Sequence, residues 1–258
     1  MQLNIGWLYP DLMNTYGDRG NIITLGHWLK KMGIEPVINK ISVNEPADLI
    51  PKMDIIFMGG AQDKQQEIVN KDLKNNKGKY LKEAIISGVP GLYVCGAYQF
   101  LGKYYKEADG NIIDGIGIFD VYTESPGMNV PRCIGNIVVS PNISFDSGRV
   151  LRQVQDDKKS FFVGFENHGG RTYLADKKQA FANVIKGNGN NGEDGTEGFF
   201  YKNSIGSYMH GPILPKNPEV ALFLIKKAIE RKYGKSVILK KIDNSWENKA
   251  REFVISKL

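Results

Sequence analysis

The sequence predicts an α/β protein: a mostly parallel central sheet flanked by helices, with antiparallel strands added in the second half. Up to residue 102, short apolar runs alternate with amphipathic segments of helical length, which is the pattern of βαβ units. Beyond it, the apolar runs are short, bounded by glycine and rich in β-branched or aromatic residues. This texture favours antiparallel strands that complete the same sheet.

The hydrophobic periodicity also predicts where each element lies. In the parallel part we expect strands at residues 3–9, 36–41, 54–58 and 92–94, with helices at 21–31, 62–75 and 79–87. In the second half we expect strands at residues 112–119, 135–140, 161–166, 181–186 and 199–201, and helices at 218–233 and 244–257. The segment 14–20 is polar and bears glycine, so it is expected to be the loop between the first strand and the first helix.

Length and composition indicate a globular protein with one large domain. The chain has 258 residues, of which 41% are hydrophobic and 24% charged. No apolar run is long enough to span a membrane, and the first residues lack the basic segment of a signal peptide, so neither membrane insertion nor secretion is expected. With only Cys95 and Cys133 present, a reducing cytoplasm is the expected compartment. The net charge of +6 is spread along the chain rather than gathered in a stripe, so nucleic-acid binding is not expected.

The stretch around Cys95 is the strongest candidate for chemistry. Residues 92–94 are expected to be a buried strand, and residues 97–101 the first turn of a helix. A cysteine on such a turn lies at the positive end of the helix, which favours thiolate over thiol. Gly96 permits the turn and leaves its N–H free to face an oxyanion. The alternative at this point is a buried structural cysteine.

A cysteine nucleophile requires a base, and the chain has three histidines. His27 lies within the first helical pattern and is expected to be a half-buried helix residue. His210 ends an apolar stretch before a Gly-Pro turn, where its ring can reach the carboxyl edge of the sheet. We therefore favour His210 as the base over His168, which could instead orient a loop. An imidazole satisfied by backbone hydrogen bonds is the alternative for both.

Two further residues fit a substrate with an amino-acid end. Gln99 lies one helical turn beyond Cys95, so its amide is expected at the same rim. Arg132 lies in a loop rich in proline and glycine, where a guanidinium can hold a carboxylate. A solvated surface arginine is the alternative.

Other motifs point away from cofactors. Residues 187–192, GNGNNG, match the spacing of a dinucleotide-binding loop, but no helix follows and acidic residues surround them. A hairpin loop is the better interpretation. No phosphate-binding G-x-x-x-x-G-K-[ST] motif and no zinc-binding motif occur. We expect no cofactor and no metal.

Taken together, these motifs resemble a known family. The Gly59-Gly60 pair, the Cys-Gly-x-x-Gln pattern at residues 95–99 and the later histidine resemble the class I glutamine amidotransferases, which have a flavodoxin-like sheet. The segments 164–172 and 208–212 resemble the branch typified by cobyric acid synthase, and the likeness extends to the stand-alone glutaminase subunits of that branch.

The resemblance implies a role for each site residue and a division into two parts. It implies that Cys95 is the nucleophile and His210 its base. The N–H groups of Gly60 and Gly96 would bind the oxyanion, and Gln99 and Arg132 would bind the substrate. Residues 1–217 would form the amidotransferase domain, and 218–258 a C-terminal helical extension packed on it.

The resemblance also implies a reaction and a partner. L-glutamine would be hydrolysed to glutamate and ammonia. The ammonia would pass to an ATP-dependent, Mur-ligase-like synthetase subunit in a heterodimer, for amidation of the D-glutamate of lipid II during peptidoglycan synthesis. The alternatives are a glutaminase for another acceptor, such as a corrinoid, and a non-catalytic binding subunit or redox chaperone on the same fold.

One position departs from the wider family pattern. Many class I amidotransferases carry a glutamate two residues after the histidine, and this chain has Pro212 there. A carboxylate normally fixes the tautomer of such an imidazole. We therefore hypothesise that the partner subunit supplies it in trans, with Glu166 as the internal alternative.

Overall fold

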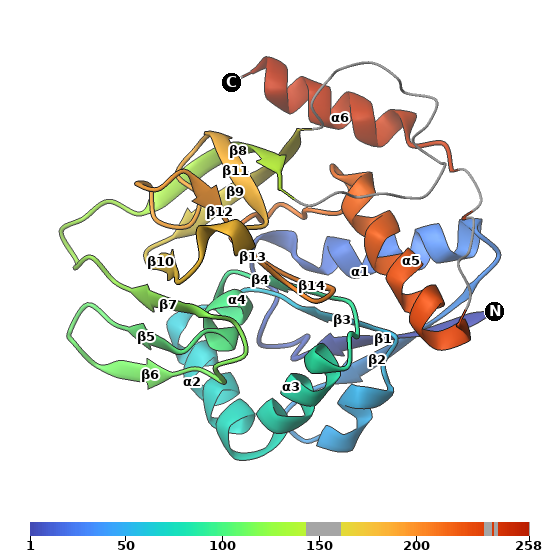
Figure 1. Cartoon of the computed structure of the whole chain (residues 1–258), viewed down its shortest axis with the longest axis horizontal. Coiled ribbons are helices and arrows are strands. Elements are labelled where there is room, and N and C mark those ends of the chain that lie inside the picture. Colours follow the sequence, from blue (N-terminus) through green and yellow to red (C-terminus); the bar gives the residue numbers. More distant parts are fainter. Residues whose placement is uncertain (143–160, 235–238, 240–241, 258) are drawn as a thin grey trace.

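A six-stranded, mostly parallel sheet forms the centre of the computed structural model, which describes residues 1–142, 161–234, 239 and 242–257 (Figure 1). Its strands follow the order β13-β14-β4-β3-β1-β2, and only β13 is antiparallel to its neighbour in this described sheet. The bounds are β1 Gln2–Leu8, β2 Glu35–Ile41, β3 Ile55–Met58, β4 Gly91–Val94, β13 Phe199–Tyr201 and β14 Ser204–Ser207. The predicted fold class is confirmed.

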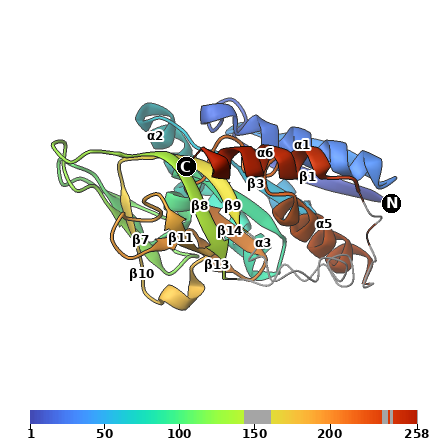
Figure 2. The same ribbon diagram turned by 90° about the horizontal axis from the view of Figure 1, so that it is seen from above.

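Helices cover both faces of this sheet, as Figures 1 and 2 show. One face packs against α1 (Arg19–Lys31) and α5 (Pro218–Tyr233), and the other against α2 (Asp63–Asp72) and α3 (Gly78–Ile86). The remaining helical segments are η1 Thr15–Gly17, η2 Ala47–Lys52, η3 Leu73–Lys77, α4 Gly96–Leu101, η4 Lys177–Gln179 and α6 Ser245–Ser256.

Burial of both faces explains why the central strands read as continuous apolar runs. In β3, Phe57 belongs to the core under α1 and α5, whereas Ile56 and Met58 belong to the core under α2 and α3. In β4, Leu92 and Tyr93 divide between the two cores in the same way. Successive side chains of a strand point to opposite faces, so a strand buried on both sides has no polar positions.

The later strands form two further sheets, which corrects the expectation that they complete the central one. These sheets have the strand orders β10-β7-β5-β6 and β12-β11-β8-β9, and of the strands that the structure describes only β13 joins the central sheet in antiparallel orientation. The bounds are β5 Tyr104–Lys106, β6 Ile112–Asp114, β7 Val121–Glu124, β8 Cys133–Pro141, β9 Phe162–His168, β10 Arg171–Leu174, β11 Ala182–Lys186 and β12 Thr196–Glu197.

The strand expected at residues 112–119 is also shorter than predicted. It ends at Asp114, because the backbone N–H groups of Ile116 and Ile118 donate to carbonyls at the C-terminal end of α4 instead of to a neighbouring strand. Gly117, with φ of +63°, makes the required turn. The apolar pattern of this segment therefore reflects packing over α4.

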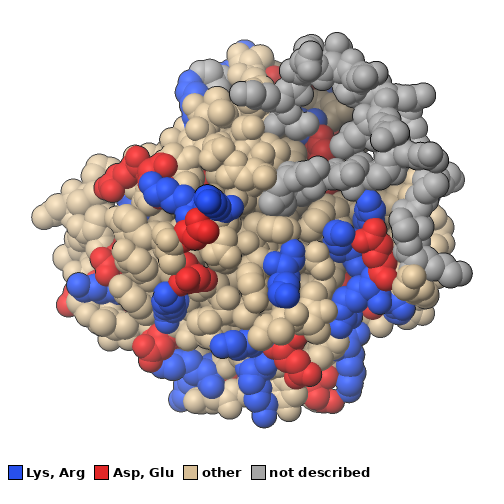
Figure 3. All heavy atoms as spheres, in the orientation of Figure 1, with Lys and Arg blue, Asp and Glu red and all other residues tan. Residues whose placement is uncertain are grey.

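The surface shows mixed charge, and the helices give no membrane signal. On the face drawn in Figure 3, Lys and Arg side chains are interspersed with Asp and Glu. Among the residues that the structure describes, no helix combines the length and the apolar character needed to cross a bilayer.

Two glycines provide a matched test of the packing. A Cβ at Gly206 in β14 would lie 2.3 Å from Tyr98 Cδ2, whereas a Cβ at Gly26 in α1 would meet no heavy atom within 4 Å. Gly206→Ala should therefore lower the free energy of unfolding by ~1–3 kcal/mol. Gly26→Ala should raise it by ~0.5–1 kcal/mol, because alanine favours the helix. Urea unfolding of both variants measures the difference, and equal stabilities would contradict the packing described.

Candidate active site

Cys95 lies on a strained turn between β4 and α4. Its backbone has φ of +54° and ψ of −109°, a conformation that non-glycine residues rarely adopt. The Cys95 N–H donates to the carbonyl of Ser207 at 2.8 Å, and its own carbonyl accepts from the N–H of Gln99 at 3.0 Å. The residue is therefore fixed by the sheet on one side and by the helix on the other. Its partly exposed thiol lies at the carboxyl end of the strands, as predicted.

His210 reaches this edge from the neighbouring strand. Strand β14 runs parallel to β4, and its chain continues past Ser207 to His210. A two-residue antiparallel bridge to β9 then holds His210: its N–H donates to the Phe165 carbonyl at 2.8 Å, and its carbonyl accepts from the Phe165 N–H at 3.1 Å. The side chain is fully buried.

Asp18 holds the imidazole of His210. This carboxylate lies at the N-terminus of α1 and is fully buried. Its Oδ1 is 3.1 Å from Nδ1 of His210, and a carboxylate only accepts, so Nδ1 carries the proton. The ring's other nitrogen, Nε2, lies on the side of the Cys95 thiol and is buried. The arrangement is a cysteine, a histidine and a carboxylate in series.

This environment keeps His210 protonated over a wide pH range. Burial opposes the positive charge on the ring, but the hydrogen bond to Asp18 and the proximity of Cys95 outweigh it. The net effect raises the pKa of His210 from 6.5 to about 10. At neutral pH the ring can therefore donate a proton to a leaving group.

Gly60 has a different partner from the one expected. Its N–H donates to Oδ2 of Asp18 at 2.8 Å, so in this structure that amide is not free to bind an oxyanion. A Cβ at Gly60 would lie 2.8 Å from the His210 ring and 3.3 Å from Cβ of Cys95, which explains why glycine is needed here. The nitrogen of the next amide, that of Ala61, lies 3.6 Å from the place of a Cβ on Gly96 and is therefore close to the start of α4.

A cavity of about 310 Å³ opens beside the Cys95 thiol. The residues that line it come from segments far apart in the chain and include Thr15, Tyr16, Ala61, Cys95, Gln99, Arg132 and His168.

The structure thus brings the two expected substrate residues to this cavity. Gln99 is buried, and its Nε2 donates to the hydroxyl of Tyr208 at 3.0 Å. Arg132 is exposed, and its Nε and Nη2 donate to the side-chain and main-chain oxygens of Asn167 at 3.0 and 3.1 Å.

The two other histidines differ sharply from His210. His27 is exposed on α1, where it was expected to be half-buried. His168 is 2% exposed, stacks on the ring of Tyr208 at 3.7 Å and lines the cavity. Its Nδ1 is 2.8 Å from the carbonyl of Gly170. Burial is the main reason that the pKa of His168 falls to about 3, so this ring is neutral at neutral pH and only a weak proton acceptor.

Glu166 is not the partner of His210. Its carboxylate accepts hydrogen bonds from the N–H and side chain of Asn188 and from the N–H of Gly189, at 2.7 to 2.9 Å. The hypothesis of a carboxylate supplied in trans assumed that this chain holds no other candidate, and Asp18 shows that this premise is wrong.

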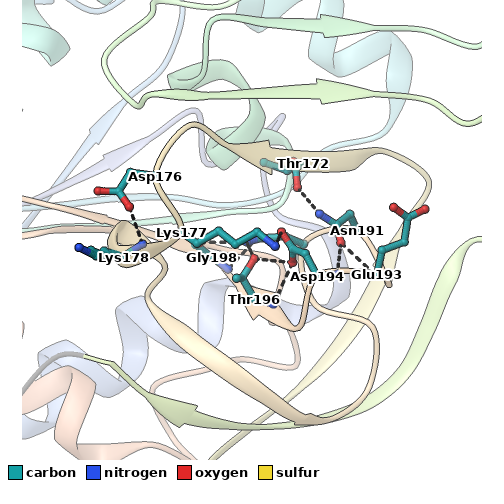
Figure 4. Close-up of polar contacts among 10 residues, drawn as sticks. Thr172, Asp176, Lys177, Lys178, Asn191, Glu193, Asp194, Thr196 and Gly198 are labelled. Carbon is teal, nitrogen blue, oxygen red and sulfur yellow. Dashed lines mark hydrogen bonds and ion pairs between the residues drawn. The ribbon is translucent and has the colours of Figure 1, made fainter.

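The glycine-rich segment is a hairpin loop, as predicted. It joins β11 to β12, which pair antiparallel, and Figure 4 shows the polar contacts that organise it. Oδ1 of Asn191 accepts from the N–H groups of Glu193 and Asp194 at 3.0 Å, and Asp194 in turn accepts from Thr196. The acidic residues thus serve the loop itself.

The sequence analysis missed Asp18 and Tyr16. Both lie in the segment 14–20, which was taken for a polar connection. Tyr16 places its ring edge-on to His210, with the centroids 5.0 Å apart, and its hydroxyl accepts from Asn167 Nδ2 at 2.7 Å. The available signal was position: the segment follows the first parallel strand at its carboxyl end, where sites of α/β sheets lie.

This geometry defines the general class of the protein. A thiol at the N-terminus of a helix, a protonated imidazole and a cavity at the carboxyl edge of a parallel sheet are the parts of an α/β cysteine hydrolase. The chain belongs to the CobB/CobQ-like glutamine amidotransferase family, whose domain matches residues 4–218. The resemblance noted in the sequence is thereby confirmed.

Individual relatives agree with this assignment. The chain is 42% identical to lipid II isoglutaminyl synthase (glutamine-hydrolyzing) subunit GatD of Staphylococcus aureus, over 99% of this chain and 96% of that protein. It is 41% identical to the subunit of the same name of Streptococcus pneumoniae, over 92% and 85%. A probable cobyric acid synthase of Methanocaldococcus jannaschii is 31% identical over 71% of this chain but only 36% of its own length.

Solved structures agree on the fold. A glutamine amidotransferase crystal structure matches with a TM-score of 0.56 and 12% identity, over 87% of this chain and 98% of that one. The glutaminase domain of Trypanosoma brucei CTPS, with bound acivicin, matches with a TM-score of 0.53 and 12% identity, over 94% and 98%.

Asp18→Asn tests the role of the buried carboxylate. Without its charge, burial dominates and the pKa of His210 falls, so the imidazolium is lost at a lower pH than in the wild type. Glutamine hydrolysis should fall by about 10²–10⁴-fold, and the alkaline limb of kcat/KM should move to lower pH. The measurement is ammonia release from pH 6 to about 10.5, spanning the His210 pKa of about 10. Glu166→Gln is the control and should leave that limb in place. If Asp18→Asn left both the rate of glutamine hydrolysis and the alkaline limb of kcat/KM unchanged, the carboxylate partner of His210 would have to come from outside this chain.

Proposed function

We propose that this chain is the glutaminase subunit of an ATP-dependent amide ligase that amidates the D-glutamate of lipid II. The observation that carries the proposal is 42% identity, over nearly the full length of both chains, to a subunit whose name states that activity. The Cys95–His210–Asp18 arrangement supplies the chemistry that such a subunit needs.

In the first half of the reaction, the Cys95 thiolate attacks the side-chain amide carbon of L-glutamine. The C–S bond forms, and the carbonyl oxygen takes the negative charge of the tetrahedral intermediate. Protonated His210 then gives its proton to the amide nitrogen, the C–N bond breaks, and ammonia leaves a γ-glutamyl thioester on Cys95. Asp18 stabilises the imidazolium before this transfer.

In the second half, water replaces ammonia. Neutral His210 now accepts a proton from water as the oxygen attacks the thioester carbon. Collapse of the second tetrahedral intermediate breaks the C–S bond, restores the thiolate and the imidazolium, and releases the γ-carboxylic acid, which gives its proton to solvent and becomes glutamate. Atoms and charge balance over the cycle, with no cofactor and no metal taking part.

Two backbone amides are placed to hold the oxyanion. The N–H of Gly96 is the first of helix α4, where helical N–H groups have no intrahelical partner. The Ala61 N–H lies near it, and we assign to Ala61 the role that the resemblance gave to Gly60, because the Gly60 amide binds Asp18.

Two residues of the cavity recognise different parts of the substrate. Two nitrogens of Arg132 bind Asn167, which fixes the plane of the guanidinium and leaves Nη1 for the α-carboxylate of glutamine. Gln99, held by Tyr208, lines the cavity beside Cys95 and contacts the glutamine side chain.

The ammonia is proposed to pass to a separate Mur-ligase-like synthetase subunit in a cytoplasmic heterodimer. This chain has no phosphate-binding G-x-x-x-x-G-K-[ST] motif, in keeping with ATP use by the partner. Residues 1–217 are the amidotransferase domain in this proposal, and 218–258 are an extension packed on it. A corrinoid acceptor is less well supported, because the cobyric acid synthase relatives are 25–31% identical and match over only 31–36% of their own length. Purification of the chain with its ligase partner, followed by lipid II amidation with glutamine, tests the acceptor.

Cys95→Ser should abolish ammonia release from glutamine, because a serine hydroxyl is a much weaker nucleophile than a cysteine thiolate. Cys133→Ser is the matched control: Cys133 is buried on β8, so its substitution should keep most of the activity. A coupled glutamate dehydrogenase assay measures both variants. Substantial turnover by Cys95→Ser would overturn the assignment of the nucleophile.

Arg132→Ala should raise KM and lower kcat/KM by about 10- to 100-fold, which corresponds to the ~1.5–3 kcal/mol of a hydrogen bond to a charged group. Arg132→Lys retains the charge but loses the paired donors, so its kcat/KM should lie between those of the wild type and Arg132→Ala. Steady-state kinetics with L-glutamine supply the comparison. An unchanged kcat/KM in Arg132→Ala would show that the arginine is a surface residue without a substrate role.

A further inference from the structure

His168 is a second buried imidazole in the wall of the cavity, and the proposed reaction does not use it. Its Nε2 is buried and has no hydrogen-bond partner among the residues that the structure describes. Buried polar atoms are nearly always paired, so an unpaired one beside a cavity points to a ligand group. The side chain is held firmly, because it stacks on Tyr208 with an interplanar angle of 10°.

The tautomer of His168 follows from its other nitrogen. Nδ1 lies 2.8 Å from the carbonyl oxygen of Gly170, and a carbonyl can only accept. Nδ1 therefore carries the hydrogen, and in the neutral ring Nε2 presents a lone pair. Burial, with the nearby charges of Arg171, His210 and Arg132, lowers the pKa of the ring to about 3, although the Gly170 hydrogen bond acts in the opposite direction. At neutral pH the unpaired nitrogen is an acceptor.

The place of His168 indicates which substrate group it meets. The turn 167–170 carries His168, and it also anchors Arg132: two nitrogens of the guanidinium bind Asn167, and Nη1 would lie 3.2 Å from a Cβ on Gly169. The α-carboxylate of glutamine is assigned to Arg132, so the α-ammonium, one carbon away, would lie near the same turn. The reacting amide is assigned to Cys95 and His210.

We propose that Nε2 of His168 accepts a hydrogen bond from the α-ammonium group of L-glutamine and so selects an α-amino acid over its deaminated analogue. The inference rests on the proposed function and adds a specificity determinant to the same cavity. It assigns the two histidines different tasks: His210 moves protons at the amide, and His168 reads the amino-acid end. A neutral acceptor suits this task, because a protonated ring would repel the ammonium group.

Two amide substitutions separate the functions of the two ring nitrogens. In His168→Asn, the amide nitrogen takes about the place of Nδ1 and can still donate to Gly170, but no acceptor remains at the place of Nε2. In His168→Gln, the amide oxygen can reach the place of Nε2. Both variants lose the stacking on Tyr208, so they are matched in that respect.

The experiment compares L-glutamine with 4-carbamoylbutanoate, which is glutamine without its α-amino group. The chain is purified together with its partner subunit. Ammonia release is then measured with each substrate for the wild type and both variants. His168→Asn should lower kcat/KM for glutamine by about 10- to 100-fold, mainly through KM. It should leave kcat/KM for 4-carbamoylbutanoate within about threefold, and His168→Gln should recover a large part of the preference for glutamine.

The ratio of the two kcat/KM values is measured on a single preparation, so partial unfolding of a variant does not change it. An equal loss on both substrates in His168→Asn would overturn the inference and leave His168 as a support for Tyr208. A wild-type protein that releases no ammonia from glutamine would instead contradict the proposed function.

Discussion

The buried carboxylate of Asp18 joins the three chain segments on which the site depends. One oxygen binds His210, 192 residues away, and the other accepts the N–H of Gly60, 42 residues away. The N-terminus of α1, the end of β3 and the segment after β14 are therefore fixed to one side chain. Both Asp18 and His210 are fully buried, and removing one member of a buried ion pair costs about 3–5 kcal/mol, because the other charge is left without a partner. The same contact thus stabilises this edge of the sheet and orients the imidazole.

The backbone beside Cys95 is tightly packed at Gly60. The conformation of Cys95, with φ of +54°, costs on the order of 1–3 kcal/mol, which the hydrogen bonds to β14 and within α4 must offset. A Cβ at Gly60 would lie 2.6 Å from Oγ1 of Thr15 and a similar distance from the ring of His210. A backbone without a side chain is needed here because it approaches the thiol and the imidazole at once. The glycine pair after β3 is thus explained by packing, independently of any role in oxyanion binding.

The sequence predicted those parts of the site that have a local pattern. Cys95 follows an apolar run and precedes a helix, and His210 follows an apolar run on a strand parallel to it. Both placements come from periodicity within about ten residues, which is where sequence patterns are informative. Asp18 has no such pattern: an aspartate in a polar, glycine-bearing segment looks like any solvated loop residue, and its partner is far away in the chain. For the same reason several later strands were predicted, whereas β5, β7, β10 and β12, which have only two to four residues, were not. The separation of the later strands into two sheets was also not predicted, since alternation fixes which face is buried and not which strand is the neighbour.

The two histidines of the cavity show how environment divides one residue type into two chemical roles. Both rings are buried, and burial by itself lowers the pKa of an imidazole. His210 is paired with a carboxylate and lies beside a thiol, so its pKa rises to about 10. At His168, burial and the nearby charges of Arg171 and Arg132 lower the pKa to about 3, and the hydrogen bond to the Gly170 carbonyl offsets this only in part. Between these values one ring carries a proton that it can transfer, and the other offers only a lone pair. The two proposed roles, protonation of a leaving amine by His210 and recognition of an ammonium group by His168, require this separation. It arises because a carboxylate and a thiol lie beside the ring of His210, whereas the one carbonyl hydrogen bond of His168 does not offset its burial.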